Sequence, residues 1–205
     1  MLCWPPMTAP RASEIRTSYD RLAAPYAAHL ADELLAKPLD RQLLDRFAAE
    51  VRGAGLVADL GCGPGHIVRY LHERGVEVCG IDLSPCMLQE ARRLHPGLQF
   101  HQGDLCALAR PAASFAGLVA FYSLVHLAPA ELPGARGELR RVLRPGGPLL
   151  LAFHVGAEIV HPGELWGVPV PLDWFFHRTE EVVAQLGAAG FQHTEVTERE
   201  PYHGA

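Results

Sequence analysis

The chain lacks several features that would point to a membrane or to a nucleic acid. None of its 205 residues belongs to an apolar stretch as long as the roughly 18–20 residues that cross a bilayer. Residues 1–6 have neither the basic start nor the apolar core of a signal peptide. The formal net charge is −5, whereas a nucleic-acid-binding protein usually shows a basic face. We therefore expect one domain, located in the cytoplasm, with no membrane span and no nucleic-acid partner.

Cysteine is scarce and shows no metal-binding spacing. The cysteines are Cys3, Cys62, Cys79, Cys86 and Cys106. Their number is odd and no C-x-x-C pair occurs, which argues against a zinc centre and against a disulfide framework. We expect most of them to be buried in a reducing compartment, with Cys62 beside a bound ligand because it lies in a glycine-rich loop. No cluster of ligating residues predicts a metal.

That loop is the most informative segment of the sequence. Residues 57–60 form a short strand pattern that contains Asp59, and a helical pattern begins at Ile67. Between them lie three glycines at alternate positions, Gly61, Gly63 and Gly65. Glycine allows the backbone to turn sharply and to approach a ligand closely. Because the start of a helix offers free N–H groups to an anion, the segment predicts a cofactor-binding loop.

The loop departs from the nicotinamide fingerprint G-x-G-x-x-G, because the third glycine position holds His66. Its pattern, D-x-G-x-G-x-G, resembles motif I of the class I S-adenosylmethionine-dependent methyltransferases. Four further blocks follow in the order of that family. They are a strand pattern ending in Asp82 (76–82), a strand pattern ending in Gly-Asp-Leu (98–105), an apolar block (115–127) and a Leu-Arg-Pro-Gly-Gly segment (139–154). The resemblance covers about residues 15–200 and points to the small-molecule methyltransferases of the ubiquinone- and menaquinone-biosynthesis kind (types 11 and 25).

Alternating strand and helix patterns over residues 57–154 predict an α/β fold with a doubly wound, mostly parallel, Rossmann-like sheet. We expect a disordered tail at 1–12 and one domain at 13–205, with a helical lid at 13–52 that Pro25 breaks or kinks and a substrate-side insertion at 155–177. Residues 191–197 alternate like a sixth strand. The residues after Glu200 are too few for the antiparallel strand that ends the family's sheet, so we expect that strand to be missing through truncation.

The resemblance assigns roles at the cofactor site. It implies that the glycine loop contacts the methionine part of S-adenosylmethionine, that Asp82 accepts hydrogen bonds from the ribose hydroxyls, and that Asp104 reaches the adenine. The predicted cofactor-binding residues are Tyr19, Asp59, Gly61, Cys62, Gly63, Gly65, Asp82, Leu83, Met87, Asp104, Leu105 and Phe121. Tyr19 lies in a segment that resembles the Tyr-Asp-x-x-Ala-x-x-Tyr lid of related enzymes. Packing of the helix onto the sheet explains Tyr19 equally well and explains Tyr26 better.

His126 is the candidate catalytic base. It follows the fourth strand pattern, close to where the methyl group is expected, and an unperturbed histidine titrates near neutrality. The alternative is a structural histidine that only shapes the pocket. The candidate substrate-binding residues are His126, His154 and Trp174.

The sequence thus predicts an enzyme that transfers a methyl group from S-adenosylmethionine to an O, N or C atom of a small molecule by in-line displacement, without a metal. Three alternatives stay open at this point: a non-catalytic S-adenosylmethionine-binding protein, an RNA or protein methyltransferase, and a nicotinamide oxidoreductase, which His66 disfavours. Neither the acceptor nor the oligomeric state can be read from the sequence.

Overall fold

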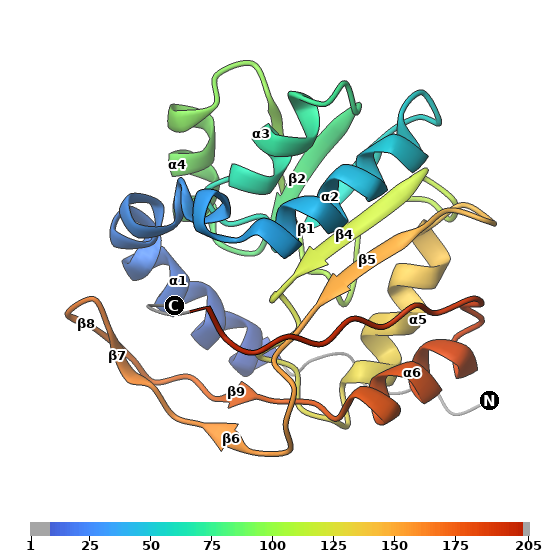
Figure 1. Ribbon diagram of the computed structural model, residues 1–205. Helices are drawn as coiled ribbons and strands as arrows, with labels where there is room; N and C mark the ends of the chain where they lie inside the picture. Colours follow the sequence, from blue (N-terminus) through green and yellow to red (C-terminus); the bar gives the residue numbers. More distant parts are fainter. Residues whose placement is uncertain (1–8, 203–205) are drawn as a thin grey trace.

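A five-stranded parallel sheet forms the centre of the molecule in the computed structural model, which describes residues 9–202 (Figure 1). The strands are β1 (Val57–Leu60), β2 (Val78–Asp82), β3 (Gln99–Gln102), β4 (Gly117–Phe121) and β5 (Leu149–Ala152). They lie in the order β3-β2-β1-β4-β5, and every neighbouring pair is parallel. The predicted α/β class is confirmed. The strand order reverses between β1 and β4, which is where open α/β sheets bind their ligands.

Helices cover both faces of this sheet. They are α1 (Ala9–Leu30), α2 (Pro38–Val51), α3 (His66–His72), α4 (Pro85–Leu94), α5 (Leu132–Val142) and α6 (Thr179–Ala188), with a short 3-10 helix, η1, at Glu33–Ala36. Phe47 of α2, Leu71 of α3 and Leu88 of α4 share one buried cluster with the sheet. Leu139 and Val142 of α5 pack with Leu60 on the other face. No helix among residues 9–202 is long and apolar enough to cross a membrane.

The N-terminal helix differs from the expectation at its start and at Pro25. Residues 9–12, which we expected to belong to a disordered tail, start α1, and the helix continues through Pro25 to Leu30. Leu22, Ala23 and Ala27 on either side of the proline are buried, and α1 packs against α4. This packing holds the helix together across the backbone N–H that Pro25 lacks. The rest of the expected tail, residues 1–8, lies outside the described residues.

The sixth strand expected at 191–197 does not form. Residues 191–202 carry no strand, and their red trace passes β5 and returns towards the lid (Figure 1). Both Glu195 and Val196 are exposed, so the alternating pattern buries no face that would favour a strand. The segment is instead held by side chains, since Arg199 lies 3.3 Å from a carboxylate oxygen of Asp40.

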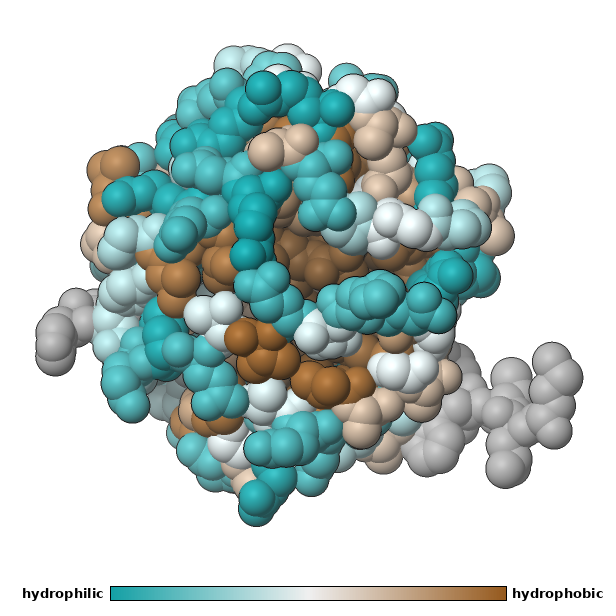
Figure 2. Space-filling view, turned by 45° about the vertical axis from the view of Figure 1, so that its right-hand side comes forward, coloured by the Kyte–Doolittle hydropathy of each residue, from teal (hydrophilic) through white to brown (hydrophobic). Residues whose placement is uncertain are grey.

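As a result, β5 is the last strand of the sheet among residues 9–202. Its four residues are only half-buried, and no hydrogen bond joins them to the C-terminal segment in the described part of the chain. Figure 2 turns this side of the molecule forward and shows a hollow with an apolar interior, crossed by a hydrophilic band. No antiparallel strand joins the sheet within the described range.

The expected insertion at 155–177 folds as two small antiparallel sheets. Strand β6 (Ile159–Val160) pairs with β9 (Trp174–Phe175), and β7 (Gly163–Leu165) pairs with β8 (Val168–Val170). Val170 and Leu172 share a buried cluster with Ile15 and Leu22 of α1. The insertion and the N-terminal helix therefore pack on each other.

Arg136 of α5 is a fully buried cation, 1% exposed, and its Nε and Nη1 atoms have no hydrogen-bond partner among the described residues. Burial lowers its pKa to about 10. A buried charge without a partner costs more than a well-packed apolar side chain. We expect Arg136→Met to raise the free energy of unfolding by about 1–4 kcal/mol in urea titrations.

The matched control is Arg93→Met, because the Arg93 side chain is 63% exposed on α4 and its loss should change stability by less than about 0.5 kcal/mol. A destabilised Arg136→Met protein would contradict the prediction and would indicate a partner for the guanidinium.

Candidate active site

A cavity opens at the carboxyl ends of the central strands, beneath α1. Its empty space is about 780 Å³, which includes the solvent at its mouth. Many of the predicted site residues line it: Tyr19, Gly61, Gly63, Asp82, Leu83, Met87, Asp104, Leu105, Phe121 and His126. The strand ends and the lid helix thus bring together residues that lie more than 100 positions apart in the chain.

The glycine loop needs glycine for two separate reasons. All three glycines have positive φ angles, +74° at Gly61, +50° at Gly63 and +84° at Gly65, a region that other residues rarely adopt. A Cβ atom on Gly61 would also lie 2.4 Å from the Cβ of Ser123. Gly65 precedes α3 and packs against the ring of Phe100, so it shapes the loop from behind without lining the cavity.

Asp82, at the end of β2, has its carboxylate fixed by the backbone. Its Oδ2 accepts the Gly63 N–H at 2.8 Å and its Oδ1 accepts the Ser84 N–H at 2.8 Å. Burial raises the pKa of Asp82, and these hydrogen bonds oppose that effect. Each carboxylate oxygen keeps a further lone pair. Asp82 therefore offers the cavity two hydrogen-bond acceptors at a fixed position, which suits a pair of neighbouring hydroxyls.

The thiol of Cys62 does not face the cavity, contrary to the expectation. It is buried behind the loop, 2.6 Å from where a Cβ on Gly80 would lie, and burial raises its pKa well above the usual range. The strand β2 leaves room for it only because Gly80 has no side chain. Asp59 also lies behind the loop; it is 1% exposed, and its Oδ2 has no partner among residues 9–202.

Burial, reinforced by the negative charge of Asp82, raises the pKa of Asp59 from 3.8 to about 8. Above pH 4 the unfolded protein releases this proton while the folded protein keeps it. The contribution of Asp59 to the free energy of unfolding should therefore fall as pH rises from about 4 to 8 and then change no further, whereas neutral His126, whose pKa burial lowers to about 4, contributes a rise below pH 6.5. We expect Asp59→Asn to remove the Asp59 contribution, so that its free energy of unfolding exceeds that of the wild type by an amount that grows with pH to on the order of 4 kcal/mol at pH 7, as measured by urea unfolding of the ligand-free proteins across this pH range. If the free energy of unfolding depends on pH equally in the wild type and in Asp59→Asn, the prediction is contradicted.

One wall of the cavity is apolar and lies next to Asp82. Leu83, Met87 and Leu105 line it together with Asp104. The Asp104 Oδ1 accepts the Cys106 N–H at 2.8 Å, which fixes that carboxylate as well. A flat aromatic ring bearing a polar edge suits an apolar wall that ends in a fixed carboxylate.

His126 also lines the cavity, and it is held on both ring nitrogens. Its Nε2 is 2.7 Å from the Tyr19 hydroxyl, and its Nδ1 is 3.0 Å from the backbone carbonyl oxygen of Asp173. Burial lowers the pKa of His126 to about 4, so the ring is neutral at physiological pH. The base predicted from the sequence therefore lines the cavity as a neutral imidazole.

His154 and Trp174 do not line the cavity, contrary to the expectation. The His154 ring stacks on Phe176 at 4.9 Å and lies parallel to Trp174 at 6.4 Å. Burial lowers the pKa of His154. The ring also lies 4.8 Å from Tyr122, which does line the cavity. The two residues thus support the cavity wall from behind.

Several lining residues were missed from the sequence, namely Ile15, Arg16, Tyr26, Ser84, Gly103, Tyr122, Ser123 and Leu127. Tyr122 is the most informative of them. It has a φ of +52°, and its hydroxyl accepts a hydrogen bond from Arg199 at 3.0 Å. Its position directly after β4 was the available signal, because residues at strand ends face the ligand in such sheets.

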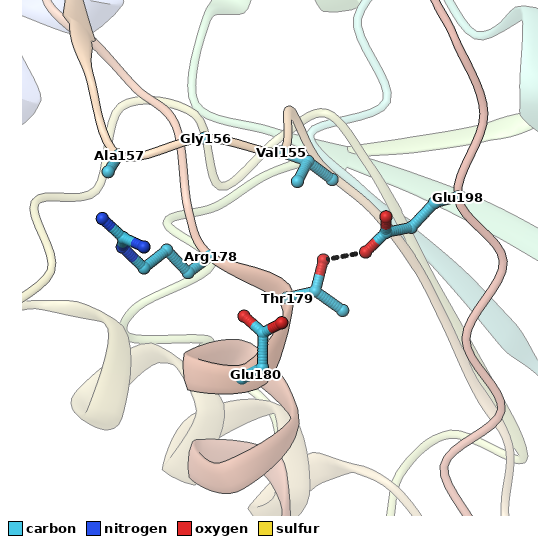
Figure 3. Close-up of a pocket in the computed structure, with 7 residues that line it drawn as sticks. All are labelled: Val155, Gly156, Ala157, Arg178, Thr179, Glu180 and Glu198. Atoms are coloured by element: carbon cyan, nitrogen blue, oxygen red, sulfur yellow. Dashed lines mark hydrogen bonds between the residues drawn. The ribbon is translucent and has the colours of Figure 1, made fainter.

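A second pocket lies on the surface at the start of α6 (Figure 3). Its lining includes Arg178, Glu180 and Glu198, and Thr179 donates a hydrogen bond to Glu198 at 2.6 Å. It shares no residue with the cavity under α1 and holds none of the predicted site residues. No group of three or more His, Cys, Asp or Glu residues is arranged to hold a metal ion in the described part of the chain.

Comparison with known proteins agrees with this geometry. The methyltransferase domain family matches residues 57–147. Malonyl-(acyl-carrier protein) O-methyltransferase of Serratia marcescens is 32% identical over 152 residues, which cover 74% of this chain and 57% of that protein. Trans-aconitate 2-methyltransferase of Methylobacterium nodulans is 44% identical over 98 residues, which cover 45% of this chain and 36% of that protein. The chain spans about half the length of the curated relatives it matches.

Among solved structures, the DhpI–SAH complex has the same fold. Its TM-score is 0.72 at 21% sequence identity, and the match covers 90% of this chain and 89% of that chain. The family match covers the glycine loop, Asp82 and the Pro-Gly-Gly turn before β5. Residues 57–147 therefore form a methyltransferase domain of type 25, and the chain has the fold of the class I S-adenosylmethionine-dependent methyltransferases.

Proposed function

We propose that this protein transfers a methyl group from S-adenosylmethionine to a small-molecule acceptor in the cavity beneath α1. The observation that carries the proposal is the Asp82 carboxylate, fixed by two backbone N–H groups and facing a cavity that the glycine loop also lines. This arrangement supports a ligand with two adjacent hydroxyls, as a ribose has. Bound S-adenosylmethionine supplies an activated methyl group, so the protein has mainly to position the reactants.

The lining residues divide between the two reactants. Asp82 would hold the ribose, Leu83, Met87, Asp104 and Leu105 would hold the adenine, and Gly61 and Gly63 would contact the methionine part. Phe121 would complete the cofactor site, and Tyr19, predicted from the sequence as a cofactor-binding residue, would instead face the acceptor. His126, a neutral imidazole that lines the same cavity, would take up the acceptor's proton. The proposed reaction uses no metal.

A small acceptor is favoured over a macromolecule because the cavity lies under α1, and the insertion packs on that helix. The relatives' names support an acceptor of small acyl or acid groups, since they specify malonyl-(acyl-carrier protein) and trans-aconitate. A non-catalytic S-adenosylmethionine-binding protein is the competing candidate, because the fixed Asp82 serves binding alone equally well.

The test is incubation of the purified chain with methyl-labelled S-adenosylmethionine and a panel of small alcohols, phenols, amines and carboxylic acids. We expect release of S-adenosylhomocysteine that depends on the acceptor and that Asp82→Ala abolishes. Tight binding of S-adenosylhomocysteine without turnover on any acceptor would favour the non-catalytic alternative. Absence of binding by the folded protein would refute both.

A further inference from the structure

The hydrogen bonds of His126 have a fixed direction. The Asp173 carbonyl oxygen accepts hydrogen bonds and cannot donate one, so the Nδ1 atom, 3.0 Å away, carries the imidazole proton. In a neutral imidazole the other nitrogen is then an acceptor. The Tyr19 hydroxyl, 2.7 Å from Nε2, must therefore donate its proton to His126. This leaves the Tyr19 oxygen with lone pairs and with no proton for a third group.

Three further contacts hold the pair in this arrangement. The Tyr19 and His126 rings meet edge to face with their centroids 5.3 Å apart. Arg11, on the same helix as Tyr19, donates a hydrogen bond to the backbone carbonyl of His126 and lies 3.5 Å from Glu131. Burial raises the pKa of Tyr19, so its hydroxyl keeps its proton.

Both side chains line the cavity. From this geometry, and resting on the proposed methyl transfer, we infer that Tyr19 is the catalytic residue that touches the acceptor, and that the acceptor is protic: a hydroxyl, phenol or amine whose X–H donates to the Tyr19 oxygen. His126 acts through Tyr19 and is the final proton acceptor.

The proton and electron balance of the step follows from this chain. The acceptor atom forms a bond to the methyl carbon, and the electron pair of the broken carbon–sulfur bond stays on sulfur. The X–H proton passes to the Tyr19 oxygen while the Tyr19 proton passes to His126 Nε2. The imidazolium formed keeps its Nδ1–H on the Asp173 carbonyl. His126 returns this proton to solvent after the product leaves.

A carboxylate acceptor fits this arrangement poorly. It carries no proton at neutral pH, so it has no X–H to donate to the Tyr19 oxygen, and the Tyr19 proton is already donated to His126. The inference therefore separates this chain from an enzyme that esterifies a carboxylic acid, although the two reactions use the same cofactor.

The direction of the hydrogen bonds can be tested without an acceptor. In protein labelled with nitrogen-15 at histidine, long-range proton–nitrogen correlation spectra distinguish the two tautomers. We expect His126 to stay in the Nδ1–H form from pH 5.5 to 8 and the Tyr19→Phe variant to shift only the Nε2 resonance. An Nε2–H tautomer, or an imidazolium at pH 7, would overturn the inference even if the protein is an active methyltransferase.

The second test measures turnover with catechol and tyramine as protic probes and benzoate and trans-aconitate as carboxylate probes. We expect turnover with protic probes only, and a fall in kcat of about 100-fold or more in Tyr19→Phe with an unchanged Kd for S-adenosylhomocysteine. The matched control is Tyr70→Phe, because the Tyr70 hydroxyl donates a hydrogen bond to the Asp45 carboxylate and Tyr70 does not line the cavity. Turnover restricted to carboxylates, or full activity in Tyr19→Phe, would overturn the inference. If the wild-type protein does not bind S-adenosylhomocysteine, the proposed function is refuted instead.

Discussion

Replacing Asp82 with alanine should weaken the binding of S-adenosylhomocysteine at least about 100-fold, which corresponds to about 2.7 kcal/mol. The substitution removes the proposed partner of both ribose hydroxyls. It also leaves the N–H groups of Gly63 and Ser84 without the carboxylate that now accepts them, and an unpartnered buried donor costs about 1–3 kcal/mol. Isothermal titration of the purified variant measures the change.

The matched control for Asp82→Ala is Glu90→Ala, which removes a surface carboxylate of α4 that pairs with Arg93. We expect its Kd for S-adenosylhomocysteine to stay within twofold of the wild type. Thermal melting of both variants separates lost binding from lost folding. Binding by a folded Asp82→Ala protein at wild-type strength would show that the ribose lies elsewhere.

Gly61→Ala should be among the most destabilising single substitutions in the glycine loop, costing about 3 kcal/mol or more of unfolding free energy. Alanine at φ +74° carries the strain of the left-handed region, about 1–2 kcal/mol. The added Cβ would also lie 2.4 Å from the Cβ of Ser123, so one of the two backbone segments must shift. Urea unfolding measures the cost.

The chain offers a control that separates these two causes. Gly53 has a φ of +77°, and a Cβ there would meet no atom within 4 Å. Gly53→Ala should therefore show the strain alone, and Ser123→Gly added to Gly61→Ala should recover the steric part of the loss. Equal costs for Gly61→Ala and Gly53→Ala would show that the contact with Ser123 contributes nothing.

The central sheet could be predicted because its strands are short, because β1, β2, β4 and β5 are mostly apolar, and because helical patterns separate them. The segment 57–60 is buried at every position, so its sequence needs no tertiary information to be recognised. The expected strand at 191–197 did not form, and α1 continues through Pro25 without a break, for the opposite reason. Both depend on what packs against the segment, which alternation and proline propensity do not reveal.

The residues of the candidate site also fall into two groups, those with a local sequence pattern and those without one. Gly61, Gly63 and Asp82 could be found because a strand end, a turn and a carboxylate leave a local pattern. Tyr122 could have been found from its position after β4, but its hydrogen bond with Arg199 could not, because Arg199 is distant in sequence. Nor does the sequence reveal which nitrogen of His126 carries a proton, since the backbone carbonyl of Asp173 decides it.

A crystal structure of the chain with S-adenosylhomocysteine would show where the cofactor binds. We expect the ribose on the Asp82 carboxylate, the adenine between Leu83, Met87 and Leu105, and the sulfur facing the side of the cavity that holds Tyr19 and His126. A ligand bound outside this cavity, or crystals that stay empty at saturating S-adenosylhomocysteine, would contradict this expectation.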